Sequence, residues 1–504
     1  MINKRTIYAY IIIIISLIIH SCVNNPPDIP PNKVVPSKQQ IEYQKMELIG
    51  FVHFSINTFT DKEWGYGDES PDVFNPTALN TDQWAEVAKE AGMGQLILTA
   101  KHHDGFCLWP SKYTEHSVKN NPWKDGGRDV VGEFVNSCRK YGLKAGLYLS
   151  PWDRNHAEYG YQAYVTYYRE QLRELLTQYG EISEIWFDGA NGGTGYYGGA
   201  DEERRIDRTS YYQWDEIFSY VKDLQTDILI FSDAGPDIRW IGNENGFAGK
   251  TNWSMINTEN IVIGTADTEH LNSGDPQGEK WVVGECDVSI RPGWFYHPYE
   301  DSLVKTPQEL VDIYYKSVGR NAVLLLNIPP DTRGLFHEED INSLKEFRNI
   351  INETFRNNLA QGKNITASNY RLKHKKFSPS NVLDNDNRTY WAADDTLSEV
   401  WLEIDLEEEV VFDRIMIQEP IRFGQRISEF TVECYIKDTW VTIARGTTVG
   451  YKRLLRVQPI KALKVRLNII KFNNTPAVSS FGIYKASKLD RKIYSVYINK
   501  VIQK

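Results

Sequence analysis

The amino-acid sequence predicts an α/β chain in which a TIM-like (β/α)-barrel is followed by an all-β antiparallel sandwich. Short β-type runs alternate with amphipathic helical runs between about residues 46 and 356, which is typical of a parallel sheet wrapped by helices. From about residue 357 to residue 487 the alternation stops and short alternating strands follow. A chain of 504 residues, 41% of them hydrophobic, is long enough for two or three such domains.

Eight runs of apolar residues are the strand candidates of the barrel. They cover Leu48–Ser55, Gln95–Ala100, Ala145–Ser150, Glu184–Asp188, Ile228–Ser232, Trp253–Asn257, Trp281–Cys286 and Ala322–Asn327. Stretches between them carry apolar residues at helical spacing: Thr81–Ala91, Val130–Tyr141, Tyr161–Tyr179, Tyr211–Leu224 and Pro307–Val318, with Glu338–Phe355 as a further helix. Eight strands with intervening helices predict a closed barrel.

The C-terminal part gives short strands of alternating character. The candidates are Val400–Ile404, Arg414–Gln418, Glu429–Tyr435, Trp440–Ala444 and Lys464–Ile469. Such strands without helices between them favour two packed antiparallel sheets. Residues 488–504 form a tail without a functional signal.

The N-terminus has the features of an export signal. Lys4 and Arg5 precede an apolar run from Ile7 to Ile19, which is too short to span a bilayer comfortably but fits a signal-peptide core. The run ends before Cys22 and resembles a bacterial lipoprotein signal, in which the cysteine becomes the lipidated first residue. We expect a signal in residues 1–21, a polar tether in 22–45, and a place in the periplasm or on the cell surface. The alternative is an ordinary cleaved signal.

Composition narrows the possible partners. The 57 basic and 67 acidic residues give a net charge of -10 without a Lys/Arg stripe, so nucleic acid is not expected as a partner, and a membrane only through the lipid anchor. Aromatic residues make up 12% of the chain, which suits stacking on sugar rings but equally an ordinary core. The five cysteines lack CxxC spacing, so neither a zinc knuckle nor a disulfide framework is indicated.

Polar side chains follow the first four strand candidates. They are His53 after the first, His102 and His103 after the second, Tyr148 to Asp153 at the end of the third, and Asp188 at the end of the fourth. Because the C-terminal strand ends of a (β/α)-barrel meet at one rim, these groups should form one site.

Asp188 is the strongest catalytic candidate at this rim. It emerges from an apolar strand, so its carboxylate should be fixed and partly desolvated, as a nucleophile at an anomeric carbon requires. The alternative is a structural cap of the next helix. The adjacent His102 and His103 should diverge and bind neighbouring sugar hydroxyls. With His53 as a third ligand they leave open a metal-dependent hydrolase in which Asp188 is the base.

Several motifs resemble the family 29 glycoside hydrolases, the retaining α-L-fucosidases, from about Gly50 to Pro330. The motifs are His53-Phe54-Ser55, Glu63-Trp64-Gly65, Lys101-His102-His103-Asp104-Gly105-Phe106 and Trp186-Phe187-Asp188-Gly189. The resemblance implies that Asp188 is the nucleophile and that His53, Glu63, Trp64, His102, His103 and Tyr148 line the fucose subsite. It also implies that Trp294 packs on the fucose methyl group, and that catalysis needs no cofactor.

The segment Trp240-Ile241-Gly242-Asn243-Glu244-Asn245-Gly246 is similar to the branch of that family that acts on α-1,3/4 linkages of Lewis-type structures. The similarity implies that Glu244 is the acid/base, with Glu285 as the rival or as a structural partner of Arg291. Arg239 would donate hydrogen bonds to fucose or orient Glu244. The expected activity is exo-acting release of terminal fucose from oligosaccharides or glycoproteins through a covalent fucosyl-enzyme.

The segment Gly192 to Thr209, directly after the nucleophile, is a candidate to reshape the leaving-group subsite. A third reading, a surface glycan-binding lipoprotein without catalysis, is disfavoured because Asp188 and Glu244 are both present.

The C-terminal domain resembles the discoidin-like, galactose-binding-like sandwiches. The resemblance rests on Asn358-Leu359-Ala360, Thr389-Tyr390-Trp391 and the Trp401–Leu406 strand. Such domains often hold a structural calcium ion, for which Asp384, Asp386 and Thr389 offer hard oxygen ligands. The alternative for these three residues is an ordinary Asx-rich turn.

Overall fold

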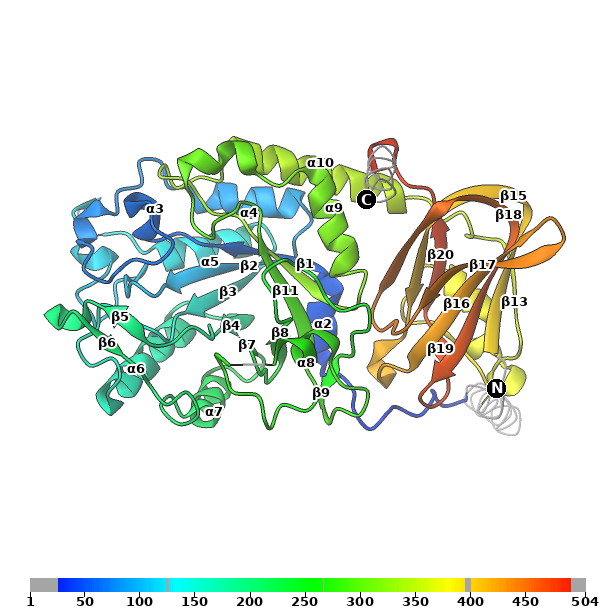
Figure 1. The fold of residues 1–504 in the computed structure, drawn as a ribbon, viewed down its shortest axis with the longest axis horizontal. Helices are drawn as coiled ribbons and strands as arrows, with labels where there is room; N and C mark the ends of the chain where they lie inside the picture. The colour runs from blue at the N-terminus through cyan, green and yellow to red at the C-terminus, as the bar shows by residue number, and fades with distance from the viewer. Residues whose placement is uncertain (1–25, 124–126, 266, 395–399, 491–504) are drawn as a thin grey trace, which may run out of the picture.

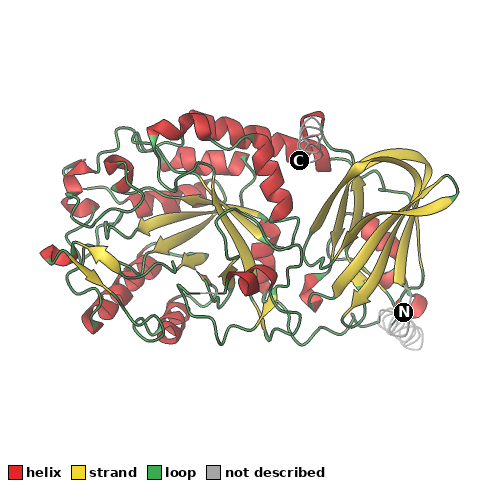
Figure 2. Cartoon of the chain, viewed as in Figure 1, coloured by secondary structure: helices red, strands yellow, loops and turns green. Residues whose placement is uncertain are grey.

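The computed structural model describes residues 26–123, 127–265, 267–394 and 400–490 as a barrel domain beside a sheet domain (Figures 1 and 2). The predicted export signal, including Cys22, lies outside the described residues. Among the helices that are described, none has both the length and the apolar character needed to cross a membrane.

Eight parallel strands close the barrel, which confirms the predicted fold class. The strands are β1 (Leu48–Val52), β2 (Gln95–Lys101), β3 (Lys144–Leu149), β4 (Glu184–Trp186), β7 (Leu229–Ser232), β8 (Ile238–Trp240), β11 (Val283–Ser289) and β12 (Val323–Asn327). Each pairs with its neighbour in chain order, and β12 pairs with β1 to close the ring. Seven of the eight expected strand runs provide barrel strands.

Helices cover the outside of the barrel at the predicted places. The principal ones are α4 (Thr81–Glu90), α5 (Val130–Lys140), α6 (Gln162–Gln178), α7 (Trp214–Leu224), α9 (Pro307–Lys316) and α10 (Glu338–Phe355). Local signals set their starts: the Asn80 side chain caps α4, and Thr306 with Glu309 forms a capping box at α9. Shorter helices are α2 (Lys38–Met46), α3 (Asn57–Thr60) and α8 (Thr268–Ser273).

The sixth barrel strand differs from the prediction. Trp253–Asn257 does not enter the barrel; instead β9 (Met255–Ile256) pairs with β10 (Lys280–Trp281) in a separate two-stranded sheet. The barrel position belongs to β8, in which Ile238 lies opposite Phe231 of β7. This strand has only three residues, with a charged Arg239 at its centre, so the sequence offers no apolar run to mark it.

The C-terminal domain is antiparallel, as predicted. Its main sheet contains β13 (Asn364–Ala367), β15 (Val400–Gln418), β16 (Ile427–Ile436), β17 (Thr439–Gly446), β18 (Arg453–Phe472) and β20 (Ser480–Tyr484). The short strands β14 (Trp391–Ala392) and β19 (Ala477–Val478) form a second sheet. Two expected strands, 400–404 and 414–418, are the ends of the single long strand β15, which pairs along most of its length with β18.

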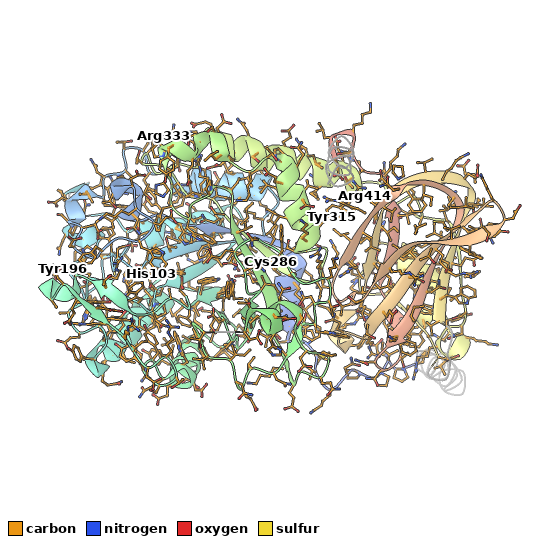
Figure 3. The ribbon with its side chains drawn as sticks, in the orientation of Figure 1. His103, Tyr196, Cys286, Tyr315, Arg333 and Arg414 are labelled. Carbon is orange, nitrogen blue, oxygen red and sulfur yellow. The ribbon has the colours of Figure 1, made fainter. Side chains whose placement is uncertain are left out.

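The barrel and the sheet domain are docked together by polar and apolar contacts. The backbone N–H of Asn252 donates to Thr448 Oγ1 at 2.9 Å, and Leu454 packs into the barrel core. Figure 3 shows Arg414 of β15 at the junction with Tyr315 of α9, where the guanidinium lies 5.9 Å from the ring centre. The two domains therefore share buried surface.

The expectation of a free polar tether over residues 22–45 is wrong for the part that is described. Ile29 is 1% exposed and packs with Tyr390 and Phe423 of the C-terminal domain. Asn32 donates through its backbone N–H to the Phe423 carbonyl at 2.9 Å. Further on, α2 places Tyr43 in the core at the base of the barrel. The apolar side chains in this polar segment explain why it packs.

Candidate active site

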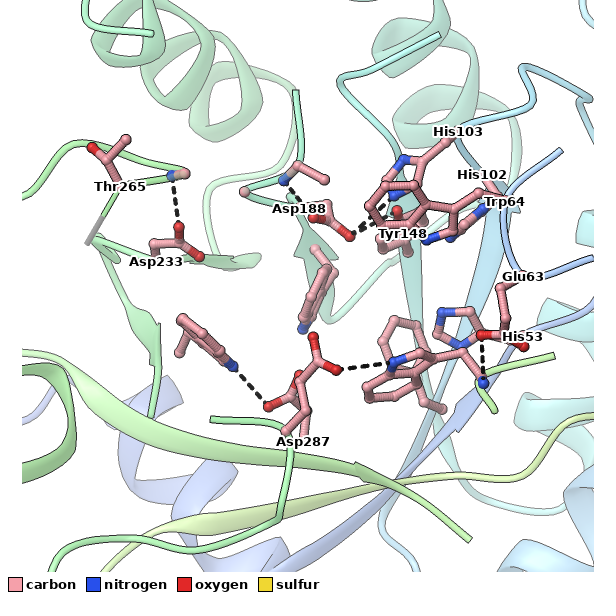
Figure 4. A pocket seen from close by; sticks show the side chains of 18 of the residues that line it. His53, Glu63, Trp64, His102, His103, Tyr148, Asp188, Asp233, Thr265 and Asp287 are labelled. Carbon is pink, nitrogen blue, oxygen red and sulfur yellow. Dashed lines mark hydrogen bonds and ion pairs between the residues drawn. The ribbon is translucent and has the colours of Figure 1, made fainter. Parts of the chain in front are cut away.

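A cavity of about 540 Å³ opens at the C-terminal ends of the barrel strands (Figure 4). Its lining includes His53, Glu63, Trp64, His102, His103, Tyr148, Asp188, Glu244 and Trp294 from the sequence prediction. It also includes Phe51, Trp186, Gly189, Ala190, Arg208, Asp233, Trp240, Gly264, Thr265 and Asp287. The chain thus brings the predicted rim residues together, with the exception of Arg239.

Asp188 is held in place by two hydrogen bonds at the end of β4. Tyr148 donates from its hydroxyl to Oδ2 at 3.0 Å, and the backbone N–H of Ala190 donates to Oδ1 at 2.6 Å. Burial raises the pKa of Asp188, while these two hydrogen bonds lower it. The side chain is still 25% exposed, so the carboxylate is oriented and yet open to the cavity.

The three histidines of the cavity are neutral bases with defined partners. His53 Nδ1 lies 2.8 Å from Asn327 Oδ1, and His103 Nδ1 lies 2.7 Å from Ser150 Oγ. Burial lowers the pKa of His53 and of His103 to about 3, and lowers that of His102 as well. Neutral imidazoles can both donate and accept hydrogen bonds, as sugar hydroxyls require.

The metal-dependent hydrolase is not favoured by the arrangement of these groups. Across the described ranges, the chain gathers no cluster of three or more His, Cys, Asp or Glu side chains that could hold a metal ion. His102 and His103 diverge in their partners, because Nδ1 of His102 faces the Asn57 side chain.

Glu63 ties two loops of the site together. Its carboxylate accepts hydrogen bonds from the backbone N–H groups of Trp294 at 2.8 Å and Phe295 at 3.0 Å, and lies 2.8 Å from His297 Nε2. This fixes the loop after β11 against the loop that follows α3. The indole of Trp294 then lies 5.1 Å from the His53 ring and lines the cavity.

Glu244 follows β8 and differs from Asp188 in its surroundings. Its Oε2 accepts a hydrogen bond from Trp294 Nε1 at 3.2 Å. Burial raises the pKa of Glu244, and the negative charges of Asp188 and Glu63 raise it further against the opposing hydrogen bond of Trp294. The protonated form of Glu244 is therefore favoured relative to a free glutamic acid.

Two cavity carboxylates were missed by the sequence analysis. Asp233 directly follows β7, and Asp287 lies in β11 beyond the predicted strand end. Asp287 accepts a hydrogen bond from Trp240 Nε1 at 2.9 Å, and burial with the nearby charge of Glu244 raises its pKa. The signal was available, because both follow the predicted strands as closely as the other rim residues do.

Arg239 does not reach the cavity, so its expected contact with fucose or Glu244 is wrong. Its guanidinium is fully buried and donates to Asn252 Oδ1 at 3.0 Å and to the carbonyls of Leu271 and Trp253 at 2.9 Å. Neighbouring residues of a strand point to opposite faces, and Trp240 is the one that faces the cavity.

Glu285 lies beneath the cavity and does not line it. It accepts hydrogen bonds from Trp186 Nε1 at 2.9 Å and from the Tyr43 hydroxyl. The expected pairing with Arg291 is also wrong, because Arg291 forms its ion pairs with Asp340 at 3.0 Å and Asp301 at 2.9 Å.

The three residues expected to bind calcium lie close together in the C-terminal domain. The Thr389 hydroxyl donates to Asp384 Oδ2 at 2.7 Å, whereas the Asp386 carboxylate is paired with Arg388 at 2.8 Å. The arrangement shown does not fit a calcium ion as it stands, because the guanidinium occupies Asp386. The calcium site stays a prediction.

Comparisons with known proteins agree with this site. The family model described as alpha-L-fucosidase matches residues 35–354, and the F5/8 type C domain model matches residues 364–482. Alpha-L-fucosidase 1 of Arabidopsis thaliana is 44% identical over 476 residues, covering 93% of this chain and 91% of the relative.

Solved structures give the same result. A glycoside hydrolase 29 family member from an unknown rumen bacterium is 44% identical with a TM-score of 0.81, covering 91% of this chain and 78% of that one. A Ruminococcus gnavus GH29 fucosidase in complex with fucose is 34% identical with a TM-score of 0.82, covering 92% of this chain and 98% of that one. The chain therefore belongs to the glycoside hydrolase family 29 α-L-fucosidases and carries an F5/8 type C domain behind its barrel.

Proposed function

We propose that this α-L-fucosidase is a retaining, exo-acting enzyme that releases terminal α-1,3- or α-1,4-linked fucose from Lewis-type glycans. The observation that carries the proposal is a pair of carboxyl groups that line one cavity and differ in their contacts. Asp188 is anchored by Tyr148 and Ala190, while the pKa of Glu244 is raised by burial and by the charge of Asp188. Burial raises both pKa values, but two donors stabilise the ionised form of Asp188, as a nucleophile requires, whereas nearby negative charges favour the protonated form of Glu244, as an acid requires.

The reaction then follows in two steps. In the first, Asp188 attacks the anomeric carbon, the bond to the glycosidic oxygen breaks, and Glu244 gives its proton to that oxygen. In the second, Glu244 takes a proton from water, the hydroxide attacks the anomeric carbon, and Asp188 leaves as a carboxylate. Two inversions give net retention, for which the carboxyl groups must lie about 5 to 5.5 Å apart.

One side of the cavity suits a single fucose residue. Neutral His53, His102 and His103 can exchange hydrogen bonds with its hydroxyls, and Tyr148 and Glu63 add further polar groups. Trp64 and Trp294 supply aromatic surface, and we assign Trp294 to the fucose methyl group. The linkage preference rests on the resemblance of the Trp240–Gly246 segment, which carries Glu244 into the cavity.

The test compares three substrates: a Lewis-type trisaccharide, 2'-fucosyllactose and an aryl α-L-fucoside. We expect the wild type to cleave the trisaccharide and the aryl fucoside, and to cleave 2'-fucosyllactose poorly. Proton NMR of the first product should show α-L-fucose before mutarotation, because retention preserves the anomeric configuration. A β-L-fucose first product would refute the retaining mechanism.

Variants assign the two roles. We expect Asp188→Asn to lose activity on all three substrates, because no nucleophile remains. Glu244→Gln should lose far more activity on the trisaccharide than on an aryl fucoside whose leaving group needs no proton. Equal losses on both substrates would contradict the role of Glu244 as the acid, and Glu285→Gln serves as the matched comparison for the rival residue.

Two further proposals come from the sequence. We infer that Cys22 is lipidated and that the enzyme is exported to the periplasm or cell surface; Cys22→Ala should abolish labelling by radioactive fatty acid and release the protein from membranes.

We also propose that calcium binds at Asp384, Asp386 and Thr389 after displacing Arg388 from Asp386. Added calcium should then raise the Tm of the wild type but not of Asp384→Ala.

A further inference from the structure

The cavity has a second wall, which the fucose side does not use. Figure 4 shows Asp233 and Thr265 on the opposite side of Asp188 from the three histidines, Trp64 and Glu63. Arg208 and Trp240 also line the cavity, and Arg208 and Asp233 both bind the backbone of Gly264. Glu244 must face the glycosidic oxygen, so the sugar beyond that oxygen has to lie against residues outside the fucose side.

Asp233 is built into this wall. It is 7% exposed, and its Oδ2 accepts a hydrogen bond from the backbone N–H of Gly264 at 2.7 Å. The carboxylate packs against the backbone next to the nucleophile, since a Cβ atom on Gly189 would lie 2.5 Å from Asp233 Oδ2. Among the described residues, the hydrogen bond to Asp233 is made at Oδ2, and the side chain lines the cavity. The Asp233 carboxylate can therefore accept a hydrogen bond from a ligand in the cavity.

Arg208 is held beside Asp233 through the same glycine. Its Nη1 donates to the Gly264 carbonyl at 2.6 Å. The backbone N–H of Gly264 thus holds Asp233, and its carbonyl holds Arg208. Gly264 has φ +87°, and a Cβ atom there would lie 2.4 Å from the Gly189 carbonyl oxygen, so a side chain does not fit. Among the described residues, Arg208 and Asp233 are held by Gly264 and not by a salt bridge to each other, and both line the cavity.

Trp240 completes the wall with a fixed aromatic ring. Its Nε1 donates to Asp287 Oδ1 at 2.9 Å, and the residue is only partly buried. Carboxylate, guanidinium and indole side chains are suited to sugars, because the charged groups form hydrogen bonds with hydroxyls and the aromatic ring packs on C–H faces. The arrangement also gives a role to the segment Gly192 to Thr209, which contributes Arg208.

We propose that Arg208, Asp233 and Trp240 form the leaving-group subsite, which binds the sugar residue attached to fucose. Asp233 accepts from its hydroxyls, Arg208 donates to them, and Trp240 packs against its ring. The inference rests on the proposed function, in which Glu244 protonates the oxygen between the two sugars. It makes this wall, and not the fucose side, the part of the cavity that distinguishes one fucosylated glycan from another.

The experiment compares kcat/KM on the fucosylated oligosaccharide that the wild type cleaves best with kcat/KM on an aryl α-L-fucoside, which lacks hydroxyls on its leaving group. For Asp233→Ala and for Arg208→Gln, we expect the ratio of the two values to fall about tenfold or more, the loss typical of a hydrogen bond to a charged group. Cleavage of the aryl fucoside shows that each variant is folded. Arg205→Gln is the matched control, because Arg205 is an exposed arginine of the same segment paired with Glu203.

A second measurement does not depend on hydrolysis. Saturation-transfer NMR should detect the fucose-free leaving sugar, such as N-acetyllactosamine, on the wild type and on Arg205→Gln, and should lose that signal with Asp233→Ala. An unchanged ratio in both variants, or equal binding of the leaving sugar to all proteins, would overturn the subsite. Failure of the proposed function looks different, because the wild type itself would then cleave no fucoside or would give the inverted product.

Discussion

Removal of the Tyr148 hydroxyl group tests whether Asp188 acts as an ionised carboxylate. Tyr148 donates to Asp188 Oδ2 at 3.0 Å, and its ring is fully buried against Trp186 and Phe51. The substitution Tyr148→Phe removes this donor and keeps the ring. Asp188 retains the backbone hydrogen bond from Ala190, so the carboxylate keeps one of its two donors.

The expected size of the effect follows from the lost hydrogen bond. A hydrogen bond to a charged group contributes about 1.5 to 3 kcal/mol. One pKa unit corresponds to about 1.4 kcal/mol, so the pKa of Asp188 should rise by about 1 to 2 units. The sign is upward because the Tyr148 hydrogen bond lowers the pKa that burial raises. The nucleophile must be ionised, so the pH at which activity is lost on the acid side moves upward with this pKa.

The assay is the pH dependence of kcat/KM on an aryl α-L-fucoside. We expect the acid limb to move upward by about 1 to 2 pH units in Tyr148→Phe. Tyr168→Phe is the control, because Tyr168 is equally buried and its hydroxyl donates to the Leu149 carbonyl at 2.8 Å and not to the nucleophile. An acid limb that stays in place in Tyr148→Phe, or that moves equally in both variants, would refute the reasoning.

Three further outcomes are expected. Prolonged treatment with EDTA should leave kcat unchanged, because the described residues form no cluster of three or more His, Cys, Asp or Glu side chains that could hold a catalytic metal ion; a loss restored by zinc would contradict this. Asp340→Ala should lower the free energy of unfolding by about 1.5 to 3 kcal/mol, because the buried Arg291 loses a hydrogen bond between charged groups and keeps only Asp301, and a urea titration measures it. A chain ending after Phe355 should have a lower Tm than the whole chain, because Leu454 no longer fills the barrel core; an unchanged Tm would show that the barrel is independent.

The sequence predicts those barrel strands that are apolar runs, since these are also the strands that are buried by apolar contacts. Strands such as β1 and β12 are almost entirely apolar, because a parallel strand inside a ring of helices is buried on both faces. The pattern fails at β8, whose central Arg239 is buried by hydrogen bonds to carbonyl groups and not by apolar contacts. Trp253–Asn257 has the apolar composition of a strand, but it pairs in the small sheet with β10.

The sequence predicts those residues of the site that directly follow a barrel strand. Asp188 and the histidines follow apolar strands directly, so their place on the rim depends only on the barrel. Arg239 was misplaced because adjacency to a motif does not say which face of a strand a residue occupies. Arg208 reaches the cavity only through the fold of a long loop and its hydrogen bond to Gly264, which no local pattern in the sequence encodes.

The packed N-terminal segment constrains the order in which the chain can fold. Asn32 binds Gln425, which follows it by 393 residues, and Ile29 packs on Tyr390 and Phe423. A chain that emerges from the N-terminus onward has to wait for nearly all of its synthesis before these contacts can form, and contacts of such sequence separation form slowly. Until then Ile29 has no apolar surface to cover it. The segment around Ile29 and Asn32 therefore reaches its native place only after the C-terminal domain has been made.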